Sequence, residues 1–268
     1  SMETFNPFLT TSLHVTEAGY TKVGPSWSHL ATFFPYYRMY YITKGAAKMF
    51  MHDETLELTP DRLYFIPAFS ITGAECPREM EHFWMHFNLD ITTISYLTIY
   101  KPAPFVEAQP LDKELFRLVR ENFDAADDGA HAPNTLACQS LAKYLFSRFL
   151  PSGNVSSESA NFIPVLEYID RHLNSNISNT DLCNIMCLNE TYFSNVFTKQ
   201  FGISPKQYIL QKRIGSAARM LVETDKTVKE IAFEFGYDNE MYFNRIFHKI
   251  TGSAPGKYRK NFRAKDKL

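Results

Sequence analysis

Two stretches of the C-terminal half decide how this chain folds: 189-NETYFSNVFTKQFGISPKQY-208 and 239-NEMYFNRIFHKITGSAPGKY-258. At a constant offset of fifty residues, nine of the twenty positions are identical. The shared residues are Asn, Glu, Tyr, Phe, Phe, Lys, Gly, Pro and Tyr, which combine helix caps, core positions and turn formers. A repeat of this kind indicates a duplicated supersecondary unit.

Each copy is predicted to contain two helices joined by a tight turn. Ser178 and Thr227 each carry a hydroxyl that can cap a helix, with an acidic residue three positions later. Asn189 and Asn239 then cap a second helix, which carries a narrow apolar stripe and stops at a glycine. This order predicts two helix-turn-helix motifs, over residues 178–202 and 227–252.

The segment between the two copies has the pattern of one long helix, residues 206–223. Its apolar residues recur at helical spacing: Ile209, Ile214, Ala217, Ala218 and Leu221. Eighteen helical residues extend about 27 Å. Such a helix can hold two reading helices about one turn of B-DNA apart, roughly 34 Å. One copy alone would be an ordinary helical hairpin, but two copies joined in this way favour DNA binding.

Composition and charge bound the class of protein. The chain has 268 residues, of which 45% are hydrophobic and 21% charged, as in soluble globular proteins of about two domains. It has neither a long apolar run nor a secretion signal, so we predict a cytoplasmic protein without membrane contact. Lys and Arg number 12 against 18 Asp and Glu up to residue 160, but 16 against 11 afterwards. This asymmetry indicates that the C-terminal half meets a polyanion, or that it ends in a solvated basic tail.

The C-terminal half resembles the DNA-binding module of AraC/XylS-type bacterial transcription regulators. In the second copy the matching residues are Ile231-Ala232, Phe235-Gly236-Tyr237, Tyr242-Phe243, Arg245-Ile246-Phe247, Gly252, Pro255 and Tyr258-Arg259. In the first copy they are Phe197, Gly202, Ser204-Pro205, Tyr208-Ile209, Arg213-Ile214 and Ala217 to Leu221. The resemblance implies a unit that inserts two recognition helices into successive major grooves of a double-stranded DNA operator. It also implies transcription activation, with RNA polymerase as a partner.

The recognition helices are expected to present polar side chains to base edges. The resemblance places base readers at Thr191, Ser194, Asn195, Glu240, Met241, Asn244 and Arg245. Asn195 can pair with adenine and Arg245 with guanine, whereas Glu240 can accept a hydrogen bond from cytosine. An Arg at the position of Arg245 also serves the fold in this family, so both roles stay open. Phosphate contacts are expected from Lys199, Lys206, Lys249, Lys257 and Arg259.

The N-terminal half has the pattern of a β-rich domain. Short segments rich in aromatic and β-branched residues alternate with turn formers, and they predict strands at 38–43, 47–51, 54–58, 62–66 and 83–88. Strands this close together indicate a small jelly-roll barrel. Their order resembles the cupin-like sensor domain of the same regulators. We therefore predict a multidomain α+β fold, with a cupin-like β-barrel and a helical pair before an all-α tandem helix-turn-helix domain.

A small-molecule pocket is predicted inside the barrel. Its proposed lining is Arg38, Tyr40, Tyr64, His82, Trp84 and His86. Aromatic faces with a few polar groups suit a sugar or a similar polyol, although the same residues can simply fill a barrel. A metal-dependent cupin enzyme is the rival, but the His-x-His-x3-Glu spacing of such sites is absent. We therefore predict no catalytic residue, metal or cofactor.

Two amphipathic helices follow, and either dimerise the protein or pack on the barrel. The predicted organisation is a sensor barrel at 1–110, a helical pair at 111–150, a polar linker at 151–160 and a DNA-binding domain at 161–268. Cys183 and Cys187 are expected to form a buried apolar pair rather than a zinc site.

The sequence as a whole predicts a DNA-binding regulator, an activator that responds to a small ligand such as a carbohydrate and acts as a homodimer. A cupin enzyme with a helical appendage and a ligand-blind constitutive DNA binder are the alternatives.

Overall fold

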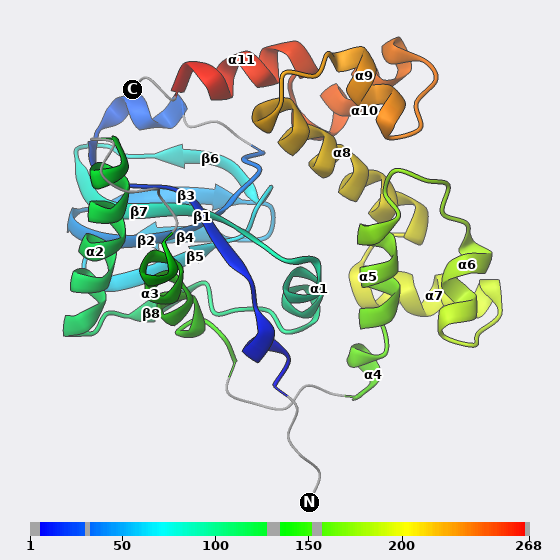
Figure 1. The fold of residues 1–268 in the computed structure, drawn as a ribbon, viewed down its shortest axis with the longest axis horizontal. Coiled ribbons are helices and arrows are strands. Elements are labelled where there is room, and N and C mark those ends of the chain that lie inside the picture. The colour runs from blue at the N-terminus through cyan, green and yellow to red at the C-terminus, as the bar shows by residue number, and fades with distance from the viewer. Residues whose placement is uncertain (1–5, 30–32, 128–134, 152–156, 266–268) are drawn as a thin grey trace, which may run out of the picture. The chain divides into compact units, whose positions relative to one another are not determined.

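The computed structural model describes residues 6–29, 33–127, 135–151 and 157–265. The chain divides into two compact units, Ser1–Gly153 and Asn154–Leu268 (Figure 1). Half of the predicted linker, residues 152–156, lies outside the described residues, and helix α4 (Ser157–Ala160) forms its end. No helix in the described part of the chain is long and apolar enough to cross a membrane.

The N-terminal unit contains two antiparallel sheets. The five-stranded sheet has the order β1 (Leu13–Val23), β7 (Met80–Leu89), β2 (Tyr37–Gly45), β5 (Arg62–Ile66) and β8 (Phe105–Glu107). The three-stranded sheet has the order β4 (Thr55–Leu58), β3 (Ala47–Met51) and β6 (Ile71–Glu75). All five strands expected from the sequence are present, but β1, β6 and β8 were not anticipated.

The predicted cupin-like barrel takes the form of two separate sheets and is not closed. Each sheet keeps two edge strands, so the hydrogen-bonded ladder does not run continuously from one sheet into the other. Gly45 marks the point where β2 ends and the chain bends into β3. Its φ is +74°, and a Cβ there would collide with the backbone carbonyl of Glu79. This bend sends the chain into a second sheet instead of closing the first.

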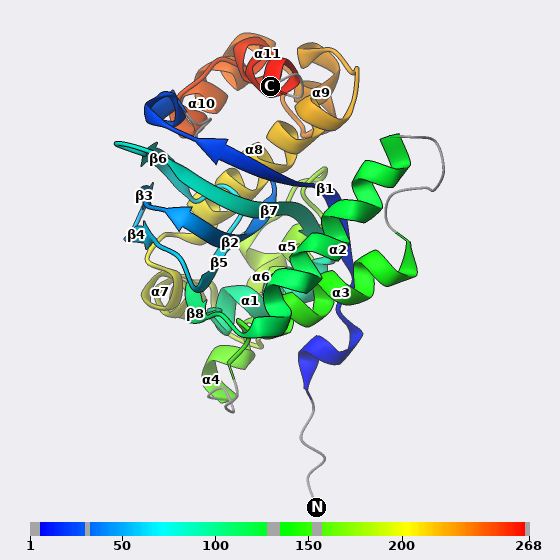
Figure 2. The same ribbon diagram turned by 90° about the vertical axis from the view of Figure 1, so that its left-hand side faces the viewer.

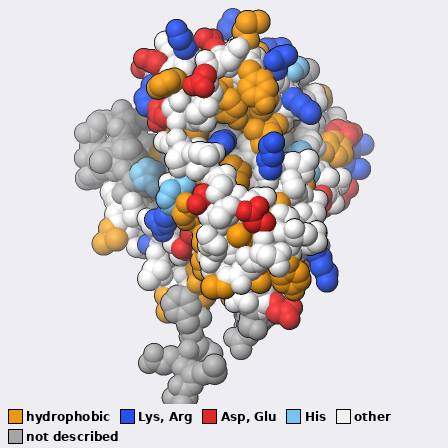
Figure 3. Space-filling model, turned by 90° about the vertical axis from the view of Figure 1, so that its right-hand side faces the viewer, with side chains coloured by type: hydrophobic (Ala, Val, Ile, Leu, Met, Phe, Trp, Pro, Cys, Tyr) orange, Lys and Arg blue, Asp and Glu red, His pale blue; other side chains and the backbone are white. Residues whose placement is uncertain are grey.

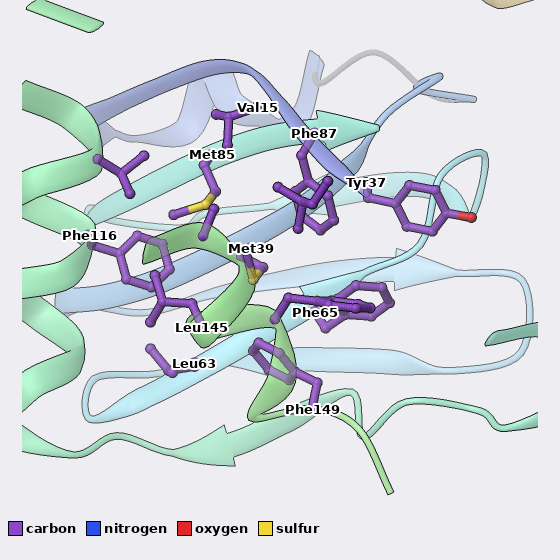
Figure 4. Close-up of a cluster of buried hydrophobic side chains, with 14 of the residues drawn as sticks. Val15, Tyr37, Met39, Leu63, Phe65, Met85, Phe87, Phe116, Leu145 and Phe149 are labelled. Carbon is purple, nitrogen blue, oxygen red and sulfur yellow. The ribbon is translucent and has the colours of Figure 1, made fainter. Parts of the chain in front are cut away.

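Helices α2 (Pro110–Asp127) and α3 (Leu136–Ser147) cover one face of the five-stranded sheet, with the three-stranded sheet on its other side (Figure 2). The side chains between helices and sheet form an apolar core. This core includes Val15, Met39, Leu63, Phe65, Met85, Phe87, Phe116, Leu145 and Phe149 (Figure 4). Burying so many large apolar groups dominates the stability of this unit. The helical pair therefore packs on the sheet, as one of the two expectations had it.

An ion pair fastens the start of α2 to the end of α3. The side chain of Asp112 is fully buried, and its two oxygens accept hydrogen bonds from Nη1 of Arg148 at 2.5 and 2.6 Å. Arg148 also donates from Nη2 to the carbonyl of Glu107 at 3.0 Å. Short elements flank the sheets: the 3-10 helices η1 (Pro7–Thr10) and η2 (Pro25–His29), and α1 (Ile91–Ile99), which Asp90 caps.

The C-terminal unit is helical. Its helices are α4, α5 (Ile163–Arg171), α6 (Asn179–Ile185), α7 (Glu190–Phe201), α8 (Pro205–Glu223), α9 (Val228–Glu234), α10 (Glu240–Thr251) and α11 (Pro255–Lys265). The pairs α6–α7 and α9–α10 lie near opposite ends of α8 (Figure 1). The capping boxes at Ser178 and Thr227 are formed, and Gly202 and Gly252 end their helices in the left-handed conformation.

The duplication seen in the sequence extends to side-chain geometry. The ring centroids of Phe197 and Tyr208 lie 5.4 Å apart at 82°, and those of Phe247 and Tyr258 lie 5.5 Å apart at 82°. In each copy an arginine of the last helix also donates to a carbonyl just before the first helix of the motif. Arg213 does so to Ser175, and Arg263 to Thr224 at 2.7 Å. The two motifs are therefore held to their neighbouring helices in the same way.

Candidate DNA interface and ligand face

The two recognition helices, α7 and α10, each bury one side and expose the other. Phe193 and Phe197 are fully buried in the first copy, and Phe243 and Phe247 are fully buried in the second. These rings form the contact with the rest of each motif. The opposite side of each helix is consequently left for a partner molecule.

The structure places most of the predicted base readers on that open side. The exposed ones are Thr191, Asn195, Glu240, Met241 and Arg245. The Met241 side chain is 77% exposed, which is unusual for a large apolar residue and suits contact with a thymine methyl group. The guanidinium carbon of Arg245 lies 5.8 Å from the centroid of the Tyr242 ring, so this side chain rests on its own helix and remains accessible.

The remaining two readers are half-buried. Ser194 and Asn244 occupy equivalent positions at the offset of fifty residues. The Oδ1 atom of Asn244 is buried and has no hydrogen-bond partner among the described residues. Asn244 is thus directed partly into the motif.

A polar contact that the sequence did not reveal joins the two helices of the first motif. Thr180 on α6 donates a hydrogen bond from its hydroxyl to a carboxylate oxygen of Glu190 on α7. Glu190 also stands in the first turn of α7, where a negative charge is favourable. These contacts give Glu190 a role in holding the motif together.

Four of the five predicted phosphate contacts are exposed: Lys199, Lys206, Lys249 and Lys257. Arg259 differs, because its Nε donates to the carbonyl of Leu221 at 2.8 Å and its Nη2 donates to that of Lys226. Burial also lowers the pKa of Arg259. This guanidinium holds the end of α8, which leaves fewer of its N–H groups for the expected phosphate contact.

Apolar side chains lie among basic ones on the surface formed by α9 to α11. In the space-filling view, orange side chains in the upper half of the face have both blue Lys and Arg and red Asp and Glu side chains around them (Figure 3). The exposed large apolar residues of this part are Phe233, Met241 and Tyr242. A mixed basic and apolar surface fits a polyanion that also presents methyl groups and base edges.

The predicted buried pair of cysteines is not formed. Cys183 is buried, whereas Cys187 is exposed at the turn between α6 and α7. Its φ is +54°, and Gly236 has a φ of +80° at the corresponding turn of the second copy. A turn residue in the left-handed region cannot belong to the apolar face of the preceding helix, which explains the error.

In the N-terminal unit, the face of the five-stranded sheet opposite α2 and α3 carries the predicted ligand residues; we call it the inner face. On β2 and β7 the register pairs Arg38 with His86 and Tyr40 with Trp84. Directly paired residues point to the same side of a sheet. Strand β1, which the sequence did not predict, adds three further residues to this face. They are Glu17, Gly19 and Thr21, which pair with His86, Trp84 and His82.

Arg38 lies buried at the centre of the inner face, with 3% of its surface exposed. Its Nη1 donates to the hydroxyl of Tyr40 at 2.9 Å, and its guanidinium carbon lies 3.6 Å from the centroid of the Phe34 ring. Its Nε has no hydrogen-bond partner among the described residues. An unsatisfied donor on a buried cation is costly, so it marks a position where a ligand atom is expected.

The two histidines of the inner face are held neutral. Burial, with help from the nearby charge of Arg38, lowers the pKa of His82 to about 3 and that of His86 well below its usual value. The Trp84 ring lies 4.7 Å from that of His86, and its Nε1 donates to Thr21 at 2.8 Å. A neutral imidazole can both donate and accept a hydrogen bond, which suits recognition of a polar ligand.

Tyr64 also lies on the inner face, but its hydroxyl is engaged by the fold. It donates to the carbonyl of Glu57 at 2.6 Å and accepts from the amide of Thr59 at 2.9 Å. Tyr64 therefore supports the turn between β4 and β5 and has no free group for a ligand. Among the residues that the structure describes, no group of three or more His, Cys, Asp or Glu side chains could hold a metal ion.

Comparison with known proteins supports both the DNA interface of the C-terminal unit and the ligand face of the N-terminal unit. A family model described as "AraC-like ligand binding domain" matches residues 14–146, and one described as "Helix-turn-helix domain" matches residues 182–261. The chain belongs to the AraC/XylS family of transcription regulators. The resemblance inferred from the repeat is thereby confirmed, and so is the fold class, with two sheets in place of the barrel.

Relatives of this AraC-family chain are named as regulators. It is 30% identical over 132 residues to "Probable transcriptional regulator LumQ" of Photobacterium leiognathi, a match over 48% of this chain and 53% of LumQ. It is 22% identical over 241 residues to "Uncharacterized HTH-type transcriptional regulator YfiF" of Bacillus subtilis, covering 84% of this chain and 76% of YfiF. The chain spans about half the length of LumQ in that match.

A solved structure shares the fold. The fatty-acid-bound ToxT protein of Vibrio cholerae superposes with a TM-score of 0.57, over 93% of this chain and 94% of ToxT, at 14% identity. The order of a β-rich unit followed by a helical unit is thus the same in both proteins.

Proposed function

We propose that this AraC-family chain is a sequence-specific transcription activator of the cytoplasm, switched by a small polar ligand in the N-terminal unit. The observation that carries the DNA-binding part is the pair of equivalent recognition helices near the two ends of α8, each with an open polar side. Nineteen helical residues make α8 about 28 Å long. That length suits two contacts about one turn of B-DNA apart, roughly 34 Å.

Base reading is assigned to the exposed residues of α7 and α10, with the amide of Asn195 and the guanidinium of Arg245 as the groups able to bond a base edge in two places. The four exposed lysines contact phosphates, which sets affinity without conveying sequence. Residues 161–268 form the DNA-binding domain in this proposal, and residues 1–110 form the sensor.

The ligand response is supported by the inner face. Buried polar groups without partners are rare in stable folds, and here two of them, on Arg38 and His82, share one face with Trp84 and Tyr40. A carbohydrate or a related polar molecule would satisfy them. Its binding would shift the population of conformers that engage DNA and RNA polymerase.

Dimerisation through the helical pair, residues 111–150, belongs to the same proposal. The side of α3 that faces away from the sheet exposes 80% of Leu136 and 43% of Tyr144, and Leu111 at the start of α2 is 52% exposed. Apolar side chains left in water on paired helices favour a contact with a second copy of the chain. Two copies would place four recognition helices on one operator.

Footprinting of genomic DNA fragments, with and without a stabilising ligand, tests the proposal. We expect a protected site spanning at least two successive major grooves, with occupancy that changes when the ligand is added. Light scattering of the same samples should show a dimer. Equal footprints with and without a ligand that stabilises the protein would indicate a constitutive binder, and stoichiometric bound iron, manganese or zinc without a footprint would indicate an enzyme.

A further inference from the structure

Two buried nitrogen atoms on the inner face lack a hydrogen-bond partner among the described residues: one is a donor and the other is an acceptor. They are Nε of Arg38 and Nδ1 of His82, and neither is hydrogen-bonded to any described residue. Both side chains are 3% exposed. Tyr40 connects them, because its hydroxyl is 2.9 Å from Nη1 of Arg38 and its ring centroid is 4.7 Å from that of His82. The two unpartnered atoms therefore belong to side chains that share one neighbour, Tyr40.

The Arg38 side needs an acceptor, and preferably an anion. Arg38 forms no ion pair with the described residues, and its known contacts are a neutral hydroxyl and an aromatic ring. Glu17 is the acid nearest in register, and its charge interacts with that of Arg38, but its carboxylate contacts Nδ1 of His86 at 3.4 Å, its side chain is half exposed, and it makes no ion pair with Arg38 within 4.0 Å. A buried guanidinium without a carboxylate is unfavourable on its own. A carboxylate is the group that matches its planar donors best.

The His82 side needs a donor. His82 hydrogen-bonds to the backbone of Thr21 through its other ring nitrogen, and the ring is neutral. A neutral imidazole that donates from one nitrogen carries a lone pair on the other. Nδ1 of His82 is therefore an acceptor, and a hydroxyl group is the simplest ligand group that can donate to it.

We propose that the ligand is a small hydroxylated carboxylate, such as a sugar acid, with its carboxylate on Arg38 and a hydroxyl donating to Nδ1 of His82. This inference rests on the proposed ligand response and narrows it from neutral polyols to acids. The Phe34 ring lies 3.6 Å from the guanidinium carbon of Arg38, and the ring centroids of Phe34 and Trp84 lie 4.6 and 4.7 Å from that of His86 on the same face. They supply the apolar contact that the carbon skeleton of such an acid requires.

The test uses tryptophan fluorescence of the full chain, because both of its tryptophans report on this site. Trp84 lies on the inner face, and the Trp27 ring centroid is 6.2 Å from that of His82. The probes are matched pairs that differ only at the acid: galacturonate with galactose, glucuronate with glucose, and gluconate with sorbitol. We expect at least one acid to change the fluorescence with an affinity about tenfold or more above its neutral counterpart.

Arg38→Met tests the role of the guanidinium. We expect it to abolish the preference for the acid while the midpoint of thermal unfolding without ligand stays equal or rises, because the variant removes an unpaired buried charge. Arg120→Met, which replaces a partly exposed arginine of α2 that is paired with Asp124, is the matched control and should bind as the wild type does. If Arg38→Met does not fold, Arg38→Lys serves instead: it keeps the charge and should keep the preference with weaker binding.

Equal or tighter binding of the neutral partner, a preference that survives in Arg38→Met, or no response to any acid would each overturn the inference. The proposed function is tested separately by the footprint. A neutral sugar that changes both fluorescence and footprint would leave the regulator intact and remove only the assignment to acids.

Discussion

Replacing Lys206 by Ala separates affinity from sequence reading at the DNA interface. Lys206 is exposed in the first turn of α8, next to the end of the first motif. It offers one positive charge to the DNA backbone and no group suited to a single base. We therefore expect Lys206→Ala to weaken binding to every DNA sequence by the same factor.

The structure sets the size of the effect. If each of the four exposed lysines neutralises one phosphate, the logarithm of the binding constant falls with the logarithm of salt concentration at a slope of about −3.6. Removing one contact changes that slope to about −2.7. Between about 50 and 200 mM salt, the wild type would lose about 150-fold in affinity and the variant about 40-fold.

Asn195→Ala is the complementary change. Its amide faces solvent on α7, and one base contact made in two places is worth about 1–3 kcal/mol of discrimination. We expect this variant to lose preference at one base pair and to keep the salt slope of the wild type. Lys143→Ala, which removes an exposed lysine of α3 in the other unit, should change neither quantity.

Fluorescence anisotropy at several salt concentrations, on the footprinted site and on single-base variants of it, measures both quantities. A Lys206→Ala protein with the wild-type slope, or an Asn195→Ala protein with a changed slope and full base preference, would refute the assignment.

Three further predictions concern stability, each measured by urea denaturation. Cys187→Gly should stabilise the first motif by about 0.5–1 kcal/mol, because it removes a side chain from the left-handed region. Gly236→Ala should destabilise the second motif by about 1 kcal/mol for the same reason, and a change of the same sign in both variants would contradict this. Arg148→Met should cost about 3–5 kcal/mol because it leaves the Asp112 carboxylate buried and unpaired, and adding Asp112→Asn should restore part of the loss. The depressed pKa of His82 means that the unfolded chain binds more protons between pH about 6.5 and 3, so unfolding free energy falls as pH falls, by up to about 1.4 kcal/mol per unit. His82→Gln should reduce that slope between pH 7 and 5, and an unchanged slope would contradict the burial of a neutral ring.

Most of the helical half could be predicted, namely the two helix-turn-helix motifs and α8, but not α5 or α11. Its caps, apolar stripes and terminal glycines act over a few residues, so the sequence near each boundary contains the hydrogen-bonding groups that define it. The capping boxes at Ser178 and Thr227 are examples, and both are present. Local signals could not show which partner a charged side chain binds in the folded protein. Arg259 has the sequence context of a phosphate contact, yet it bonds to carbonyls 38 and 33 residues away.

In the β-rich half, local sequence signals predicted less and pairing between distant segments decided more. Strand β1 has a weak alternation, and its identity depends on pairing with β7, about seventy residues later in the chain. That pairing places Glu17 and Gly19 beside His86 and Trp84, which no local pattern indicates. A Cβ on Gly19 would lie 2.6 Å from the Trp84 ring, so the close approach itself exists only in the assembled sheet.

The amino-acid sequence by itself therefore determined the duplicated helical motifs, their order and the side of each recognition helix that stays open, because helix formation and capping depend on neighbouring residues. Only the tertiary structure decided that the two sheets stay separate and that Arg38 and His82 each keep a buried nitrogen without a hydrogen-bond partner among the described residues. It also decided that the polar groups of Tyr64 and Arg259 bond to backbone carbonyls of the fold. Those outcomes depend on strand register and on burial, which arise from contacts between segments far apart in the chain.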